Sequence, residues 1–246
     1  MSESWREGWR RMGDRDQVAP EFDQFAGSYD DLLADPLRNR FAVDPLHFHR
    51  RKWWIVKSLL EIQGIDYGAK RWLDVGCGRG ELLRLAGRNF AEAIGCDPSA
   101  GMLRADHSFH VVEQKSPVLL PFEDGSVDFV TAVCVYHHVH GPARKLLTDE
   151  VVRVLAPGGQ CCIVEHNPWN PVTRAIVRRC PVDVDAELLT AGQTRQLMSE
   201  SRLLTLRTDN FLFLPEACFE RFGWLEGAFR KLPLGGQYCV LARKES

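Results

Sequence analysis

Two short segments combine glycines and carboxylates in a pattern that could hold a small charged ligand. Residues 74–81 read DVGCGRGE and follow an apolar run, and residues 95–97 read GCD about one helix and one strand later. Glycines let a ligand approach the backbone, and a helix that starts after such a turn presents free N–H groups. Asp97 is placed to accept hydrogen bonds from ribose hydroxyls. Asp74 would repel a pyrophosphate but would suit an ammonium group.

The same residues argue against a nicotinamide dinucleotide. The dinucleotide fingerprint G-x-G-x-x-G requires a third glycine where this chain has Glu81. An ordinary tight turn at the glycines, and a helix cap at Asp97, remain alternatives with no ligand. Taken together, the loop and Asp97 favour a ribosyl ligand with a positively charged end that resembles an amino acid.

A second set of residues could move protons. His137 and His138 follow the apolar run VCVY, and Glu165 and His166 follow the run CCIV. A neutral imidazole near pH 7 is a suitable acceptor for the proton of a phenol, an alcohol or an acidic C–H group. These four residues are therefore candidate catalytic groups, although histidines after a strand also serve as hydrogen-bond donors in turns.

Alternating strands and helices would position both sets. We expect strands, in chain order, at 71–75, 93–96, 109–112, 127–135, 160–165, 203–214 and 237–242. We expect helices at 45–63, 81–88, 100–105, 144–155 and within 215–230, with a turn at Pro157-Gly158-Gly159 and a peripheral helix or loose arm over 1–20. This alternation predicts an α/β fold with a parallel sheet covered on both faces. Ligands bind such sheets at the carboxyl ends of the strands, where the candidate residues lie.

Composition excludes several other classes of protein. The formal net charge of the 246 residues is −2, so a basic nucleic-acid-binding face is not expected. No apolar run approaches the roughly 18 residues that span a bilayer, so we expect a cytoplasmic protein without membrane contact. The eight cysteines include no CxxC pair and sit mostly in apolar stretches, which favours reduced thiols. No Cys/His cluster has ligand spacing, so no metal is predicted.

Four segments resemble the successive motifs of class I S-adenosylmethionine-dependent methyltransferases. They are WLDVGCGRGELL (72–83), IGCDPSAGML (94–103), LLPFEDGSVDFVTAVCVYHHV (119–139) and VLAPGGQCCIVE (154–165). The segment FDQFAGSYDDLL (22–33) resembles the start of the small-molecule branch, which includes ubiquinone and menaquinone biosynthesis enzymes. The resemblance implies a Rossmann-like, doubly wound, mostly parallel seven-stranded sheet with helices on both faces and an antiparallel last strand. It also implies one domain over 1–246, with a helical lid (1–63), a cofactor-binding core (64–165) and acceptor-side segments (166–246).

The resemblance assigns S-adenosylmethionine, with S-adenosylhomocysteine as product, to the glycine loop. It places Asp74 near the ammonium group, Asp97 on the ribose, and Cys134 along the cofactor, where its thiol and that of Cys77 fill space. Ser116, followed by Pro117, stands where many relatives have an adenine-binding Asp, so a backbone group or the Ser hydroxyl would replace that contact. The remaining residues implied for the cofactor are Gly76, Cys77, Gly78, Pro98 and Met102.

Two residues outside the core motifs complete the predicted site. Tyr29 lies in the N-terminal lid, where an aromatic face could contact the sulfonium or the acceptor. Lys52 could reach the methionine carboxylate from the helix over the site. Packing in the lid is the alternative for Tyr29, and a solvated helix face is the alternative for Lys52.

The acceptor pocket is expected between the lid, 167–182 and 211–230. Six of the aromatic residues in these segments would favour an apolar or aromatic acceptor if they face it: Trp169, Phe211, Phe213, Phe219, Phe222 and Trp224. The predicted function is methyl transfer to an oxygen or carbon of a specialised metabolite, a quinone-like ring or a sugar-derived acceptor. The alternatives are N-methylation of a small amine, a non-catalytic cofactor-binding module and a nicotinamide dehydrogenase. We expect a small-molecule acceptor as partner, no nucleic acid, and a monomer or homodimer.

Overall fold

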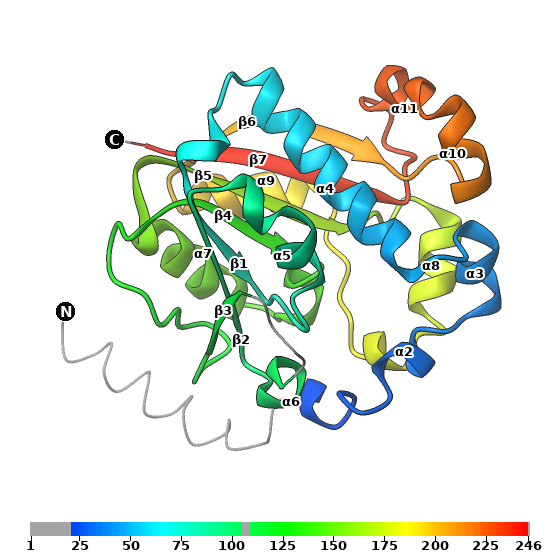
Figure 1. Cartoon of the computed structure of the whole chain (residues 1–246), viewed down its shortest axis with the longest axis horizontal. Helices are drawn as coiled ribbons and strands as arrows, with labels where there is room; N and C mark the ends of the chain where they lie inside the picture. Colours follow the sequence, from blue (N-terminus) through cyan, green and yellow to red (C-terminus); the bar gives the residue numbers. More distant parts are fainter. Residues whose placement is uncertain (1–20, 105–108, 246) are drawn as a thin grey trace.

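One seven-stranded sheet forms the centre of the computed structural model, which describes residues 21–104 and 109–245 (Figure 1). Its strands are β1 (Arg71–Val75), β2 (Glu92–Asp97), β3 (His110–Glu113), β4 (Val127–Val133), β5 (Leu155–His166), β6 (Leu203–Phe211) and β7 (Gln237–Lys244). The order is β3-β2-β1-β4-β5-β7-β6. The pairs from β3 to β5 are parallel, and β7 runs antiparallel between β5 and β6. This topology confirms the predicted doubly wound α/β fold with its antiparallel last strand.

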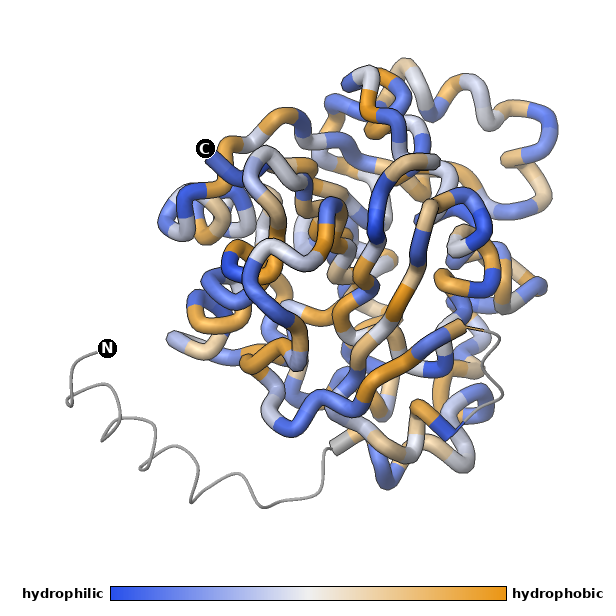
Figure 2. Tube along the Cα trace, turned by 60° about the vertical axis from the view of Figure 1, so that its left-hand side comes forward, coloured by the Kyte–Doolittle hydropathy of each residue, from blue (hydrophilic) through white to orange (hydrophobic). Residues whose placement is uncertain are grey.

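Helices cover both faces of the sheet because neighbouring strand residues point to opposite sides. Trp72 packs in one apolar cluster with Leu59 of α4 (Pro45–Ile62) and with α5 (Glu81–Ala86). Leu73 packs in a second cluster with Leu147 of α7 (Ala143–Val154) and with α9 (Ala191–Glu200). Figure 2 shows the consequence along the chain, with apolar strand segments inside and hydrophilic segments on outer turns.

Shorter elements surround the carboxyl ends of the parallel strands and the C-terminal part of the sheet. They are η1 (Glu21–Asp23), α2 (Tyr29–Leu32), α3 (Pro36–Phe41), η2 (Tyr67–Ala69), η3 (Gly87–Asn89), α6 (Ala100–Leu103), η4 (Tyr136–His138), α8 (Pro171–Val177), η5 (Pro181–Asp183), α10 (Glu216–Phe222) and α11 (Trp224–Phe229). Asp23 anchors the first of them, because its carboxylate accepts hydrogen bonds from Ser99 Oγ at 2.6 Å and from Gly101 N at 2.7 Å. The N-terminal segment is thereby held against α6.

Some strands end earlier than predicted, because a residue within the apolar run adopts a backbone conformation that a strand cannot contain. β4 ends at Val133 and not at Val135, because Cys134 adopts a left-handed conformation with φ 59°. β6 likewise ends before Leu212, whose φ is 60°. The predicted turn at Pro157-Gly158-Gly159 lies inside β5, where the register with β4 shifts. The predicted arm over 1–20 lies outside the described residues.

Two general expectations can be compared with the described residues. Every cysteine is free, as the reduced-thiol prediction requires. Within 21–104 and 109–245, the helices are all too short or too polar to cross a membrane.

Candidate functional site

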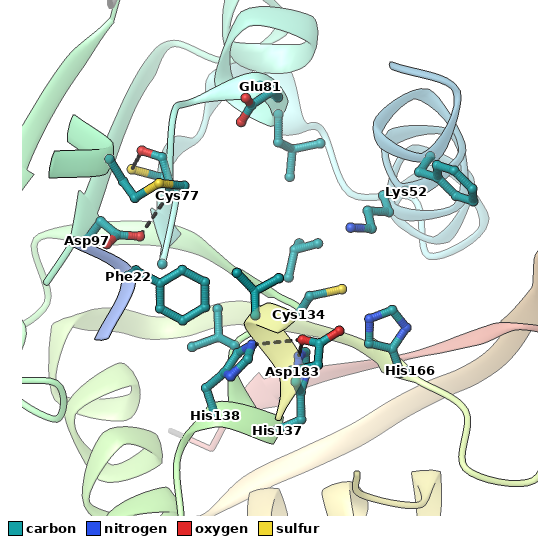
Figure 3. A pocket seen from close by; sticks show the side chains of 18 of the residues that line it. Phe22, Lys52, Cys77, Glu81, Asp97, Cys134, His137, His138, His166 and Asp183 are labelled. Carbon is teal, nitrogen blue, oxygen red and sulfur yellow. Dashed lines mark hydrogen bonds and ion pairs between the residues drawn. The ribbon is translucent and has the colours of Figure 1, made fainter. Parts of the chain in front are cut away.

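A cavity of about 1100 Å³ lies at the carboxyl ends of β1, β2 and β4 and receives the two predicted sets of residues. All the predicted catalytic and cofactor-binding residues line it except Glu165. Figure 3 shows the glycine-loop side with Cys77 and Asp97, the α4 side with Lys52, and the histidine side with His137, His138 and His166. The topology therefore brings the candidate ligand-binding and proton-transfer groups into one space.

The glycine loop between β1 and α5 needs its glycines for backbone conformation and for space. Gly76, Gly78 and Gly80 have φ values of 66°, 53° and 73°, which favour glycine. A Cβ on Gly76 would come within 2.5 Å of Val135 Cγ2. The loop backbone can therefore lie close to the segment that follows β4, and it is fixed there because Gly76 N and Cys77 N both donate to Cys96 O, at 2.8 and 3.0 Å.

Asp97 ends β2 and is tied to the glycine loop. Its carboxylate accepts hydrogen bonds from Gly78 N and Ser99 N, both at 2.8 Å, while burial raises its pKa. Two backbone donors hold the carboxylate in one orientation at the cavity wall. Gln114 follows β3 on the same wall, is buried, and donates its backbone N–H to Asp97 O at 2.9 Å. Sequence reasoning missed Gln114, because a single glutamine carries no motif.

Asp74 lies deeper, beneath the loop. Its carboxylate accepts a 2.6 Å hydrogen bond from Thr131 Oγ1, which in turn accepts one from Trp72 Nε1 at 2.8 Å. Burial raises the pKa of Asp74 to about 7. A cation that entered the cavity beside this carboxylate would favour its charged form. Lys52 reaches the cavity from α4, where its side chain is mostly buried (Figure 3).

Glu165 does not line the cavity, contrary to the expectation that it is a candidate catalytic residue. It is fully buried at the end of β5 and accepts hydrogen bonds from Val135 N at 2.9 Å and Tyr136 N at 2.7 Å. Its second oxygen lies 2.5 Å from His137 Nδ1. Glu165 therefore positions the histidine turn from beneath and does not contact a ligand in the cavity.

His137 is held between two carboxylates. Its Nδ1 faces Glu165, and its Nε2 lies 3.6 Å from Asp183 Oδ1. Although burial opposes protonation, the charge of Glu165 and the hydrogen bond to Asp183 raise the pKa of His137 to about 10. An imidazole that is already protonated near pH 7 does not suit the predicted role of general base.

His138 and Asp183 form the edge of this cluster. His138 Nε2 lies 3.4 Å from Asp183 Oδ1, and Phe22 packs edge-on against the His138 ring at 4.9 Å. Burial lowers the pKa of His138. Burial also acts on Asp183, but the two imidazoles hold the pKa of its carboxyl well below its usual range. Asp183 was not predicted, because it belongs to η5, far along the chain from the histidines.

Cys134 and His166 meet at Gln237 on β7. Gln237 Nε2 lies 3.4 Å from Cys134 Sγ and 3.3 Å from His166 Nδ1. Burial opposes ionisation of the Cys134 thiol, but Lys52 and His166 lower its pKa to about 6. The two cysteines of the cavity wall therefore differ, because burial raises the pKa of the Cys77 thiol.

Tyr29 and Ser116 both line the cavity. The guanidinium of Arg79 lies 5.3 Å from the centre of the Tyr29 ring, and burial raises the pKa of the Tyr29 hydroxyl. Ser116 forms an isolated bridge with Leu119 and accepts a 3.4 Å hydrogen bond from Val118 N. The Ser hydroxyl is therefore engaged in its own turn.

The predicted aromatic acceptor wall is mostly wrong. Of the six residues, Phe213 alone lines the cavity. Trp169 and Trp224 are 66% and 74% exposed, and Phe222 is also exposed. Phe211 is buried in the core, and Phe219 packs on Trp54 and Arg51. A stripe of aromatic residues in sequence does not say which side of a helix faces a ligand.

Apolar groups from the lid and η5 take the place of that wall. Phe22, Leu33, Phe41, Phe48 and Val182 line the cavity on this side. Two basic side chains join them, Arg38 and His49, and burial lowers the pKa of His49 to about 3. A neutral imidazole and one guanidinium therefore border this apolar group of side chains.

Comparisons with known proteins agree with this geometry. Residues 73–163 match the family model described as a methyltransferase domain. The match runs from β1 into β5 and covers less than half of the chain. The chain is 30% identical to a demethylmenaquinone methyltransferase of Staphylococcus saprophyticus over 64% of this chain and 66% of that protein. It is 34% identical to a ubiquinone biosynthesis O-methyltransferase of Psychrobacter arcticus over 52% of this chain and 60% of that protein. The chain thus aligns with less than two thirds of either relative.

The fold agrees with the family. A solved S-adenosylmethionine-dependent methyltransferase from Thermotoga maritima superposes with a TM-score of 0.66 at 18% identity, covering 91% of this chain and 98% of that structure. The cofactor of these methyltransferases is S-adenosylmethionine, as predicted. The described residues fit it: Asp97 could hold ribose hydroxyls, Asp74 an ammonium group and Lys52 a carboxylate. The glycine loop leaves room that a Cβ at Gly76 would fill.

Proposed function

We propose that this methyltransferase transfers a methyl group to a hydroxyl oxygen of an apolar, ring-containing small molecule. The observation that carries the proposal is that one cavity joins the glycine loop and Asp97 to a histidine-bordered, mostly apolar compartment. The names of two relatives, which refer to menaquinone and ubiquinone, support a quinone-like ring as the acceptor class.

The cofactor, when bound, supplies a methyl group that its sulfonium has already activated. The chain's own residues then need to orient two reactants and to manage one proton. We assign cofactor binding to Gly76, Gly78, Asp97, Asp74 and Lys52. The cofactor wall is completed by Cys77, Pro98, Met102, Ser116 and Cys134.

The acceptor compartment is lined mainly by apolar groups and borders the proton-accepting groups. Phe22, Phe48 and Phe213 would pack against the ring, and Tyr29 would close the lid side. His138 and His166 line the cavity and are less buried than His137, whose side chain is 1% exposed. Removal of a hydroxyl proton by such an imidazole contributes typically 100- to 10,000-fold to a rate.

The test measures binding and transfer separately. Calorimetry with S-adenosylhomocysteine should give binding of the intact protein, and a nicotinamide dinucleotide should give none. Labelled S-adenosylmethionine should then transfer methyl groups to a panel of quinols and simple phenols, but not to free sugars or amines. His166→Ala should keep the S-adenosylhomocysteine affinity and slow transfer at least tenfold. Transfer to amines in preference to hydroxyls would overturn the proposed acceptor class.

A further inference from the structure

We propose that His137, His138 and Asp183 bind one divalent transition-metal ion at the floor of the cavity. Each residue offers one ligand atom, and these atoms all lie within 4.8 Å of one another. From the spacing of cysteines and histidines in the sequence we predicted no metal site. The proposed site differs because the fold brings together residues that lie far apart in the chain.

The spacing of the ligand atoms suits an ion. The two Nε2 atoms lie 3.6 and 3.4 Å from Asp183 Oδ1. A tetrahedral zinc ion with bonds of about 2.0–2.1 Å separates its ligands by about 3.3–3.4 Å. Both nitrogen-to-carboxylate distances are therefore within a few tenths of an ångström of those in a zinc site. The ligand atoms of the two imidazoles lie within 4.8 Å of each other, so the rings would also turn toward one another when an ion binds.

A buried carboxylate already supports one ligand from behind. Glu165 lies 2.5 Å from His137 Nδ1, which leaves His137 Nε2 directed toward Asp183. A histidine that ligates a metal nearly always donates its other ring N–H to a carboxylate or carbonyl, which orients the ring and raises its basicity. A bound ion would occupy the position of the proton that His137 otherwise shares with Asp183.

The surroundings hold the three groups in place. The side chains of His137, His138 and Asp183 are 1%, 18% and 12% exposed. The two rings lie 4.1 Å apart on the η4 turn, and Phe22 packs against His138. Such burial lowers the entropic cost of binding, because the ligands need little further ordering.

The chemistry of the ligand set selects the class of ion. Two imidazoles and one carboxylate suit zinc and its neighbours in the first transition row, whereas magnesium and calcium prefer sets made of oxygen. Three protein ligands leave a coordination position open, as in catalytic zinc sites. All three residues line the cavity, so the open position faces it (Figure 3).

One consequence rests on the proposed function. An acceptor hydroxyl bound at the open position would have its pKa lowered by the ion. Its O–H bond would lose the proton to His166, since the ion would occupy His138. The resulting oxygen would form a bond with the methyl carbon, and the sulfonium S–C bond would break to leave a thioether. The site therefore points to acceptors with a hydroxyl oxygen that can ligate a metal.

The test uses the full chain after treatment with a chelator. Calorimetry with zinc should show one equivalent bound, magnesium should show none, and cobalt should give a visible absorption band typical of tetrahedral coordination. Asp183→Asn and His138→Ala should each weaken zinc binding at least a hundredfold. The control is His140→Ala, which removes a half-exposed histidine beside Glu187 and should leave zinc binding unchanged.

S-adenosylhomocysteine affinity, measured on the same samples, separates the two proposals. Unchanged zinc affinity in both Asp183→Asn and His138→Ala, or no zinc binding by the intact protein, would overturn the metal site. If zinc binds but S-adenosylhomocysteine does not, the proposed function is wrong and the metal site stands. Circular dichroism of each variant shows whether it has folded, and Asp183→Asn serves as the second variant if His138→Ala has not.

Discussion

Glu165 Oε2 lies 2.5 Å from His137 Nδ1, and both side chains are buried. The same carboxylate accepts the N–H groups of Val135 and Tyr136, so one acid at the end of β5 holds the whole turn that follows β4. The geometry of the histidines in the cavity depends on this acid, although it does not touch the cavity.

Replacing Glu165 with Gln should destabilise the protein by about 3–5 kcal/mol, because a buried pair loses one charged partner. Urea denaturation measures the change in the free energy of unfolding. Glu187→Gln is the control: it also faces a histidine, but its side chain is 60% exposed, and stability should hardly change. Equal effects in the two variants would contradict a positioning role for Glu165.

Removing the carboxylate of Asp97 should weaken S-adenosylhomocysteine binding. Hydrogen bonds to a charged group contribute about 1.5–3 kcal/mol each, so Asp97→Ala should raise the Kd roughly 10- to 100-fold in calorimetry. Asp128→Asn is the matched control. Asp128 pairs with Arg71 at the amino ends of β1 and β4, whereas the cavity lies at their carboxyl ends. An unchanged Kd in Asp97→Ala would rule out the assigned ribose contact.

Cofactor affinity should rise with pH through the titration of Asp74, whose pKa is about 7. A ligand ammonium prefers the carboxylate form, so binding should be close to tenfold weaker at about pH 6 than at about pH 7.5. Asp74→Asn should bind more weakly and lose this pH dependence. A pH dependence that persists in Asp74→Asn would assign it to another group.

The stability of the unliganded protein should change with pH in the opposite sense. Between the unfolded value of about 3.9 and the folded value near 7, the folded protein holds the extra proton. The contribution of Asp74 to the free energy of unfolding therefore falls as pH rises through this window. Asp74→Asn should remove that slope, which denaturation at several pH values would show.

A buried ion pair ties α4 to the C-terminal helices. Arg51 pairs with Glu226, and the other oxygen of Glu226 accepts hydrogen bonds from Phe213 N and Leu214 N. Arg51→Met should lower the free energy of unfolding by about 3–5 kcal/mol, because Glu226 is left as an unpaired buried charge. Arg50→Met is the control at the next residue, where the side chain is 51% exposed. Adding Glu226→Gln to Arg51→Met should recover part of the loss.

The acceptor wall can be tested with two aromatic residues of similar type. Phe213 lines the cavity, whereas Phe222 is exposed on α10. Phe213→Ala should raise the KM for a quinol acceptor several-fold and leave S-adenosylhomocysteine binding unchanged, since it removes apolar contact with the ring alone. Phe222→Ala should leave both quantities unchanged. A larger effect at Phe222 would place the acceptor on the outer face of α10.

Local signals in the sequence were enough for the α/β class and for the glycine-loop side of the cavity, whereas the seven-stranded sheet with its antiparallel last strand was predicted from the resemblance to a family. The apolar run 71–75, the glycines after it and Asp97 obey rules that act within a few residues, and the structure places β1 at the predicted bounds. Such rules failed where a single backbone conformation ended an apolar strand, as at Cys134 and Leu212.

By itself, the sequence determined the order of strands and helices along the chain, the glycine loop, and the acids at the ends of β1 and β2. Tertiary structure alone decided that Glu165 faces away from the cavity, that Phe213 faces it while Trp169 does not, and that Asp183 meets His137 and His138. The physical reason is that the orientation of a side chain depends on what packs behind it. Contacts between residues distant in the chain exist only after the sheet has closed and the loops have packed across its edge.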